Sequence, residues 1–215
     1  MQTKILDIAD SQSIARALEI LRAGNVIAFP TDTVYGMGAN AFDERAIEKL
    51  FRVKERARDK AMPVLLADAR DLEKIARQVP DAAKILAEKF WPGALTIIVP
   101  ASPQLPKTLL ASGDTIGARV PDHDPVRDLI RALGAPIVGT SANISGGKNP
   151  QTALDVFAQL NGRISLILDG GRTRGDVPST VIDVTIFPPR IVRVGAVSAQ
   201  EIELTLNKLY SRVVE

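Results

Sequence analysis

Apolar residues recur along this chain with two spacings, one typical of amphipathic helices and one typical of buried strands. The first helix is predicted by apolar residues at positions i, i+3, i+4 and i+7, namely Ile14, Ala17, Leu18 and Leu21. Further helices are expected at residues 46–51, 72–90 with a break at Pro80, 125–133 and 198–209. Strands are expected at residues 26–29, 63–67, 95–99, 115–120, 137–140, 164–168, 181–184 and 191–194. Helices and strands therefore alternate along the chain.

This alternation predicts an α/β fold, a single-domain, open, twisted, mixed β-sheet flanked by helices. The domain is expected to cover residues 1–215, with a core of about 14–206, because no repeat or linker divides the sequence. Trp91 is expected to anchor the core rather than to stack on a ligand. Ser198 and Glu201 have the spacing of a capping box, which predicts the start of the last helix.

Three polar segments lie beside the predicted strands. They are Pro30–Gly38 (P-T-D-T-V-Y-G-M-G), Arg52–Lys60 and Ser141–Gly147 (S-A-N-I-S-G-G). Each segment alone is also typical of an ordinary turn or a solvated surface. Their occurrence together in one chain favours a single composite site.

The segment Arg52–Lys60 carries a cation at every second position. In an extended chain these side chains would point to one side of the backbone. Such a cluster suits a polyphosphate, because Arg binds phosphate oxygens in pairs and Lys acts as a point charge. The P-loop and dinucleotide-binding motifs are absent from the sequence. A nucleotide would therefore be held by side-chain cations and hydroxyls.

Composition narrows the chemistry further. The formal net charge is only +2, so the charge alone does not indicate a nucleic-acid-binding protein. With no cysteine and a single histidine, His123 in a turn-like setting, the chemistry should proceed without a thiol and without imidazole. No apolar run approaches the roughly 18 residues of a membrane span, and a cytoplasmic protein with no membrane partner is expected.

Six motifs in order resemble the YrdC-like family, the threonylcarbamoyl-AMP synthases. They are P-T-D-T-V-Y-G-M-G, K-x-R at Lys54 and Arg56, I-G-A-R at 116–119, S-A-N-I-S-G, S-T-V-I-D and I-V-R-V-G-A. The resemblance spans about residues 14–206 and implies the short form, without the additional C-terminal domain of longer relatives. It also implies an open twisted sheet with a basic concave surface.

The resemblance implies an ATP-dependent nucleotidyltransferase. The enzyme would join L-threonine and bicarbonate or carbon dioxide to AMP and release pyrophosphate, with Mg²⁺ bound mainly through the ATP phosphates and no protein metal site. Its product would feed threonylcarbamoyladenosine formation in tRNA, so downstream tRNA threonylcarbamoyl-transfer proteins are the expected partners.

The family pattern also assigns roles to single residues. Threonine recognition falls on Thr31, Thr33, Tyr35, Arg119 and Thr180. The nucleotide site falls on Lys54, Arg56, Lys60, Thr115, Ser141, Asn143, Asn149 and Arg193. Lys54 and Arg56 are the expected catalytic residues, because they would stabilise the departing pyrophosphate.

The chain departs from the family pattern at three positions, where Ala57, Lys60 and Leu65 replace the proline, asparagine and histidine of many relatives. These changes bear on contacts around threonine and the phosphates. One alternative is a structured-RNA-binding or ribosome-maturation module, with weak backbone binding that falls steeply with salt. The related domain of carbamoyltransferases that mature hydrogenases ranks last, because its acylphosphatase and zinc modules are absent from the sequence.

Overall fold

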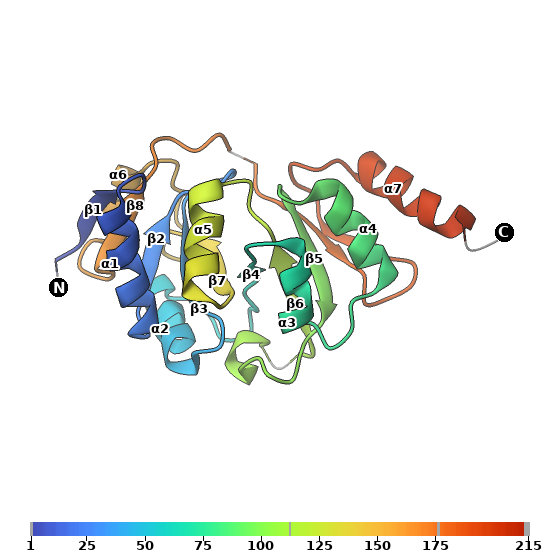
Figure 1. Ribbon diagram of the computed structural model, residues 1–215, viewed down its shortest axis with the longest axis horizontal. Coiled ribbons are helices and arrows are strands. Elements are labelled where there is room, and N and C mark those ends of the chain that lie inside the picture. Colours follow the sequence, from blue (N-terminus) through green and yellow to red (C-terminus); the bar gives the residue numbers. More distant parts are fainter. Residues whose placement is uncertain (1, 112, 176, 213–215) are drawn as a thin grey trace.

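A computed structural model describes residues 2–111, 113–175 and 177–212. Within these ranges one ten-stranded sheet runs along the longest dimension of the molecule (Figure 1). The strands are β1 (Lys4–Asp7), β2 (Ile27–Phe29), β3 (Gly36–Asn40), β4 (Val64–Leu65), β5 (Leu95–Pro100), β6 (Thr115–Arg119), β7 (Ile137–Ser141), β8 (Leu166–Asp169), β9 (Thr180–Asp183) and β10 (Arg190–Arg193). The α-helices are α1 (Ser11–Arg22), α2 (Glu44–Lys54), α3 (Leu72–Ile75), α4 (Asp81–Phe90), α5 (Asp124–Leu133), α6 (Ala153–Leu160) and α7 (Ala199–Arg212), with short 3₁₀ turns η1 (Ala69–Asp71) and η2 (Lys107–Leu109). No described helix combines the length and the apolarity needed to cross a bilayer.

The sheet is open and mixed, as the sequence predicted. Its strand order is β1-β8-β2-β3-β7-β4-β6-β5-β9-β10. Strand β7 lies near the middle and pairs antiparallel with both β3 and β4. Strand β5 pairs antiparallel with β6 on one side and parallel with β9 on the other. Several neighbours in the sheet, such as β1 and β8 or β5 and β9, therefore come from distant parts of the chain.

Helices cover both faces of the sheet because successive residues of a strand point to opposite sides. In β2, Ile27 and Phe29 pack with residues of α1 and α5 such as Leu21 and Leu129. The intervening Ala28 belongs to the other buried cluster, which also contains Leu50 of α2. The two apolar clusters lie on opposite faces of one sheet, which explains why β2 is buried on both sides.

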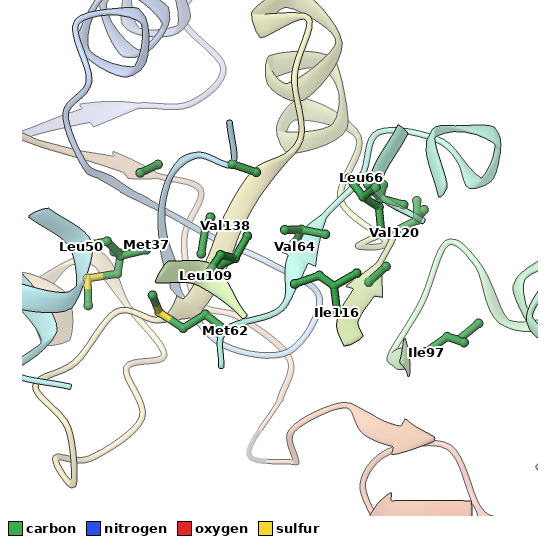
Figure 2. Packing of buried hydrophobic residues seen from close by; sticks show 14 of the residues in the cluster. Met37, Leu50, Met62, Val64, Leu66, Ile97, Leu109, Ile116, Val120 and Val138 are labelled. Atoms are coloured by element: carbon green, nitrogen blue, oxygen red, sulfur yellow. The ribbon is translucent and has the colours of Figure 1, made fainter. Parts of the chain in front are cut away.

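A row of buried side chains crosses the middle of the sheet (Figure 2). Met37, Val138, Val64, Ile116 and Ile97 follow one another from β3 through β7, β4 and β6 to β5. All five are at most 1% exposed. This continuous packing makes the strands that position the site one rigid unit.

Most elements confirm the sequence prediction. The helical stretch at 72–90 is divided before Pro80, which caps α4. Glu201 and Ser198 accept each other's backbone N–H groups at 3.1 and 3.2 Å, so the predicted capping box is present. Trp91 is buried and donates its indole N–H to the Leu95 carbonyl at 2.7 Å, as expected of a core anchor.

Among the strands and α-helices of the described residues, three were not expected from the sequence: β1, β3 and α6. The G-M-G of the first polar segment begins strand β3 instead of remaining a loop. A Cβ on Gly38 would lie 2.3 Å from the Val138 carbonyl oxygen, so this strand needs glycine to approach β7 closely. The predicted site loop is therefore confined to the residues before Gly36.

The segment Arg52–Lys60 is not extended, so its cations do not all point to one side. Helix α2 continues through Lys54, and Glu55 ends it in a left-handed conformation with φ of 52°. The cations consequently diverge: Lys54 is buried, whereas Arg58 lies over the Phe51 ring at 5.6 Å. The apolar period of α2 persists to the end of the helix, and it outweighs the alternation of charge.

Candidate active site

A cavity of about 310 Å³ opens where the ends of several strands meet. It is lined by eight residues that the sequence assigned to the site: Thr31, Thr33, Lys54, Arg56, Arg119, Ser141, Asn149 and Arg193. The three polar segments thus meet in one place, as predicted. Val34, Gly36, Pro63, Leu65, Thr96, Gly139, Thr140, Pro178 and Ser179 complete the described lining.

Lys54 projects from the last turn of α2 toward the S-A-N segment. Its Nζ donates to the Ser141 carbonyl at 2.7 Å, the Asn143 carbonyl at 3.1 Å and Asn143 Oδ1 at 2.9 Å. The residue is only 3% exposed. Burial lowers the pKa of Lys54 to about 8, and repulsion from Arg56 adds to this. The ammonium is therefore held in place by neutral oxygen atoms and is poorly compensated in charge.

Arg56 leaves the helix end and turns back onto its own loop. Its Nε donates to the Lys60 carbonyl at 3.0 Å, and its Nη2 donates to the Ala61 carbonyl at 2.9 Å. Burial lowers the pKa of the Arg56 guanidinium, against a smaller opposing effect of Asp59. The loop backbone thus fixes a half-buried cation beside Lys54.

A second cavity of about 410 Å³ adjoins the first on the side of this loop. Lys54, Arg56, Ser141 and Asn149 line both cavities. The second cavity is also lined by Lys60 and Asn143, and by the turn containing Gly146 and Gly147. The two cavities therefore share one wall, which contains Lys54 and Arg56.

Arg119 lies at the C-terminal end of β6, on the other side of the first cavity. Its Nε donates to the Gly93 carbonyl at 2.9 Å and its Nη1 to Thr33 Oγ1 at 3.1 Å. Its Nη2 donates to Asp32 Oδ1 at 2.6 Å. Thr33 and Thr31 are joined through their hydroxyls at 3.0 Å. The first polar loop and β6 thus hold one guanidinium between them.

Arg193, the last residue of β10, is the fourth cation that lines the first cavity. Its Nη2 donates to the Ser179 carbonyl at 2.8 Å and to Ser179 Oγ at 3.1 Å. The Ser179 and Thr96 hydroxyls are 2.9 Å apart. Burial lowers the pKa of Arg193, and repulsion from Arg119 contributes. Thr96 was missed by the sequence analysis, although a lone threonine inside the apolar strand L-T-I-I-V is a signal.

Three assigned residues lie outside both cavities. Tyr35 is fully buried, and its hydroxyl donates toward Gly171 O at 2.7 Å and accepts from Gly170 N at 3.2 Å. Burial raises the pKa of Tyr35. Thr180 donates its hydroxyl to the Val197 carbonyl at 2.6 Å. Thr115 stands at the opposite end of β6 from Arg119. Their direct substrate contacts stay predictions.

The first cavity is strongly cationic. Among the described residues that line the first cavity, Lys54, Arg56, Arg119 and Arg193 carry charge and no Asp or Glu is present. Within the described chain, no group of three or more His, Cys, Asp or Glu could hold a metal ion. The arrangement can bind polyanions and carboxylates and can stabilise negative charge that develops on them.

Comparison with known proteins identifies relatives of this chain. The Sua5/YciO/YrdC family model, described as telomere recombination, matches residues 19–195. The chain is 41% identical to threonylcarbamoyl-AMP synthase of Pyrococcus abyssi, over 90% of this chain and 57% of that protein. It is 39% identical to threonylcarbamoyl-AMP synthase of Bacillus subtilis, over 98% of this chain and 63% of that protein. The crystal structure of Pyrococcus abyssi Sua5 complexed with L-threonine matches with a TM-score of 0.91 and 40% identity, over 94% of this chain and 61% of that one. This chain thus spans less than two thirds of these relatives.

Proposed function

Because the chain belongs to the Sua5/YciO/YrdC family, we propose that it is an L-threonylcarbamoyladenylate synthase. In this reaction L-threonine, bicarbonate or carbon dioxide, and ATP give threonylcarbamoyl-AMP and pyrophosphate, so the enzyme would be a nucleotidyltransferase. The observation that carries the proposal is the convergence of four cations on one cavity beside two threonine hydroxyls. A single domain over residues 1–215, a cytoplasmic location, and downstream tRNA threonylcarbamoyl-transfer partners belong to the same proposal.

L-Threonine would bind at the Arg119 end of the first cavity. A guanidinium has five N–H groups, and Arg119 uses three in the bonds described above. One N–H on each of its Nη atoms remains, which suits the two oxygens of a carboxylate. The hydroxyls of Thr31 and Thr33 lie next to this position and offer polar partners to the rest of the amino acid.

The triphosphate would extend from the first cavity into the second. Lys54 and Arg56 line both, so a phosphate at their junction would meet two cations. Lys60 and Asn143 line the second cavity beyond this junction. This geometry supports an α-phosphate near Lys54 and a pyrophosphate leaving group in the second cavity.

The chemical step needs positioned reactants and charge stabilisation rather than a nucleophile of the protein. The threonine amine adds to carbon dioxide and loses a proton, which gives a carbamate. A carbamate oxygen then bonds to the α-phosphorus as the bond from this phosphorus to the bridging oxygen breaks, and pyrophosphate leaves. Lys54 and Arg56 would stabilise the charge that gathers on the leaving oxygens. Placing both substrates in one cavity removes much of the entropic barrier.

Mg²⁺ fits this arrangement as a companion of the nucleotide. It prefers phosphate oxygens and water in sites of this kind. When bound it would neutralise part of the phosphate charge, while the side chains of Lys54 and Arg56 position the phosphates themselves.

The test is pyrophosphate release from ATP and Mg²⁺, with L-threonine and bicarbonate added singly and together and L-serine as a comparison. Release that requires both additions supports the proposal. No release, together with salt-sensitive binding of structured RNA, would contradict it and favour the RNA-binding alternative.

A pair of variants links the activity to the site. Arg56→Ala should lower turnover roughly 100-fold, the usual cost of removing one group that stabilises developing charge. Arg58→Ala is the matched control, because Arg58 belongs to the same loop but lies over Phe51 instead of lining either cavity. Equal activities of the two variants would remove Arg56 from the mechanism.

A further inference from the structure

The four cations that line the first cavity differ in their partners. Lys54 and Arg56 donate to neutral oxygens of Ser141, Asn143 and the loop backbone, and Arg193 donates to Ser179. Asp59 acts on Arg56 electrostatically, but it is exposed and forms no ion pair within 4.0 Å among the described residues. Arg119 alone, among these four in the described chain, is paired with a carboxylate.

That carboxylate belongs to Asp32. Asp32 is absent from the described lining of this cavity, but it lines a neighbouring one of about 300 Å³. The Asp32–Arg119 pair is short, at 2.6 Å, and the two side chains are 13% and 8% exposed. A pair so shielded from solvent is only weakly screened by salt, so the charge of Asp32 acts at the Arg119 end of the first cavity.

We propose that Asp32 is a specificity-determining residue, which makes the Arg119 end of the cavity accept a zwitterionic amino acid and reject phosphate. This inference rests on the proposed function. Lys54 and Arg56, which have no carboxylate within ion-pair distance among the described residues, keep their positive charge for the triphosphate. The cavity is thereby divided into a phosphate end and an amino-acid end, although both ends are built around cations.

The division follows from elementary electrostatics. A phosphate dianion at Arg119 is repelled by Asp32 twice as strongly as a single negative charge would be. Asp32 changes the binding free energy of a zwitterion at the same place only slightly, because it repels the carboxylate of the zwitterion but attracts its ammonium group. Its carboxylate can still take the two free N–H groups of the guanidinium, so recognition rests on hydrogen bonds rather than on net charge.

The experiment compares Asp32→Asn with the wild type, using inorganic phosphate as the probe. The variant retains an oxygen that can accept from Arg119, but it loses the negative charge. At saturating ATP, the inhibition constant of phosphate against L-threonine should fall about tenfold, equivalent to about 1.4 kcal/mol. The KM for L-threonine should change less than this. A substitution that only disrupts the structure of the site would weaken phosphate binding, so stronger phosphate binding would distinguish a charge effect from such disruption.

Two matched variants serve as controls. Asp32→Glu keeps the charge, so phosphate should inhibit this variant to the same extent as the wild type. Asp122→Asn removes a carboxylate from the same neighbouring cavity without touching Arg119, and it should also leave phosphate inhibition unchanged. The inference would be overturned if Asp32→Asn left inhibition by phosphate unchanged. It would also be overturned if the only effect of Asp32→Asn were a higher KM for L-threonine.

A double variant keeps the inference testable if Asp32→Asn does not fold. Asp32→Asn combined with Arg119→Gln removes both charges, which buried pairs tolerate better than the loss of one partner. At saturating ATP, calorimetry should show phosphate binding to it no more tightly than to the wild type, because Asp32 and Arg119 are removed together and no uncompensated positive charge remains at this end. Phosphate bound tenfold or more tightly than by the wild type would contradict the inference. Threonine-dependent pyrophosphate release by the wild type is a separate result, so failure of the proposed function can be told apart.

Discussion

The buried ammonium of Lys54 should make the stability of this protein rise with pH. Burial, with repulsion from Arg56 as the smaller cause, lowers the pKa of Lys54 from 10.5 to about 8. Between these two values the unfolded chain binds a proton that the folded protein does not bind. The free energy of unfolding therefore increases as pH rises through this window, and below about pH 8 the folded state bears the full cost of the buried charge.

The size of the effect follows from the two pKa values. Their difference of about 2.5 corresponds to about 3 kcal/mol, since one pKa unit is worth about 1.4 kcal/mol. Lys54 is 3% exposed, so solvent screening reduces this figure little. The carbonyls of Ser141 and Asn143 favour the charged form, and about 3 kcal/mol is accordingly the upper end.

The assay is urea unfolding of the wild type and of Lys54→Met, from about pH 7 to about pH 10. Methionine keeps the buried apolar stem but has no ammonium, so the variant should lack this part of the rise. It also leaves oxygens of Ser141 and Asn143 without their donor, which shifts its stability at every pH. The decisive quantity is therefore the change with pH, not the stability at one pH.

Lys60→Met is the control for the other lysines, because Lys60 is an exposed residue of the neighbouring loop. Its pH dependence should follow that of the wild type. Parallel curves for the wild type and Lys54→Met would refute the reasoning, since they would show that the buried ammonium does not titrate in this window.

Three further outcomes follow from the same structure. In initial-rate measurements of pyrophosphate release, kcat/KM for ATP should fall above about pH 8 as Lys54 of the free enzyme loses its proton, and a flat profile to about pH 9 would contradict this role. Tyr35→Phe should lower the free energy of unfolding in urea by about 1–3 kcal/mol, because the buried hydroxyl that bonds Gly170 and Gly171 is lost; a change below about 0.5 kcal/mol would speak against it. Gly195→Ala would place a Cβ 2.3 Å from the Pro178 carbonyl oxygen, so thermal unfolding should show a loss of more than about 2 kcal/mol, and unchanged stability would be the opposing result.

The sequence predicted the fold best where one strong local pattern coincided with the final packing. Helices α1 and α2 follow their apolar periods, and the Ser198–Glu201 capping box fixes the start of α7. Strand β3 was not predicted, because the glycines at its start are typical of turns. At Gly38 that glycine is required by a neighbouring backbone from about one hundred residues later in the chain, which no local pattern reveals.

The candidate site shows the same limit. The sequence predicted that the three polar segments form one composite site, and Thr31, Lys54 and Ser141 of these segments do line one cavity. The sequence could not show that the Tyr35 hydroxyl bonds to the Gly171 carbonyl instead of lining the cavity, because the type of a residue does not determine where its side chain points in the folded protein. It also gave no reason to choose Asp32, whose importance depends on a partner in β6.

The late position of β9 and β10 has a consequence for synthesis of the protein on the ribosome. Both Ser179 and Arg193 line the first cavity, yet β9 pairs with β5, whose residues are made some eighty positions earlier. A nascent chain that already carries Lys54 and Arg56 therefore still lacks one wall of the cavity. Such long-range pairings form last, after the intervening chain is available. The first cavity is consequently complete only after residues 179–193 have been made, so a growing chain does not present the whole proposed substrate site before then.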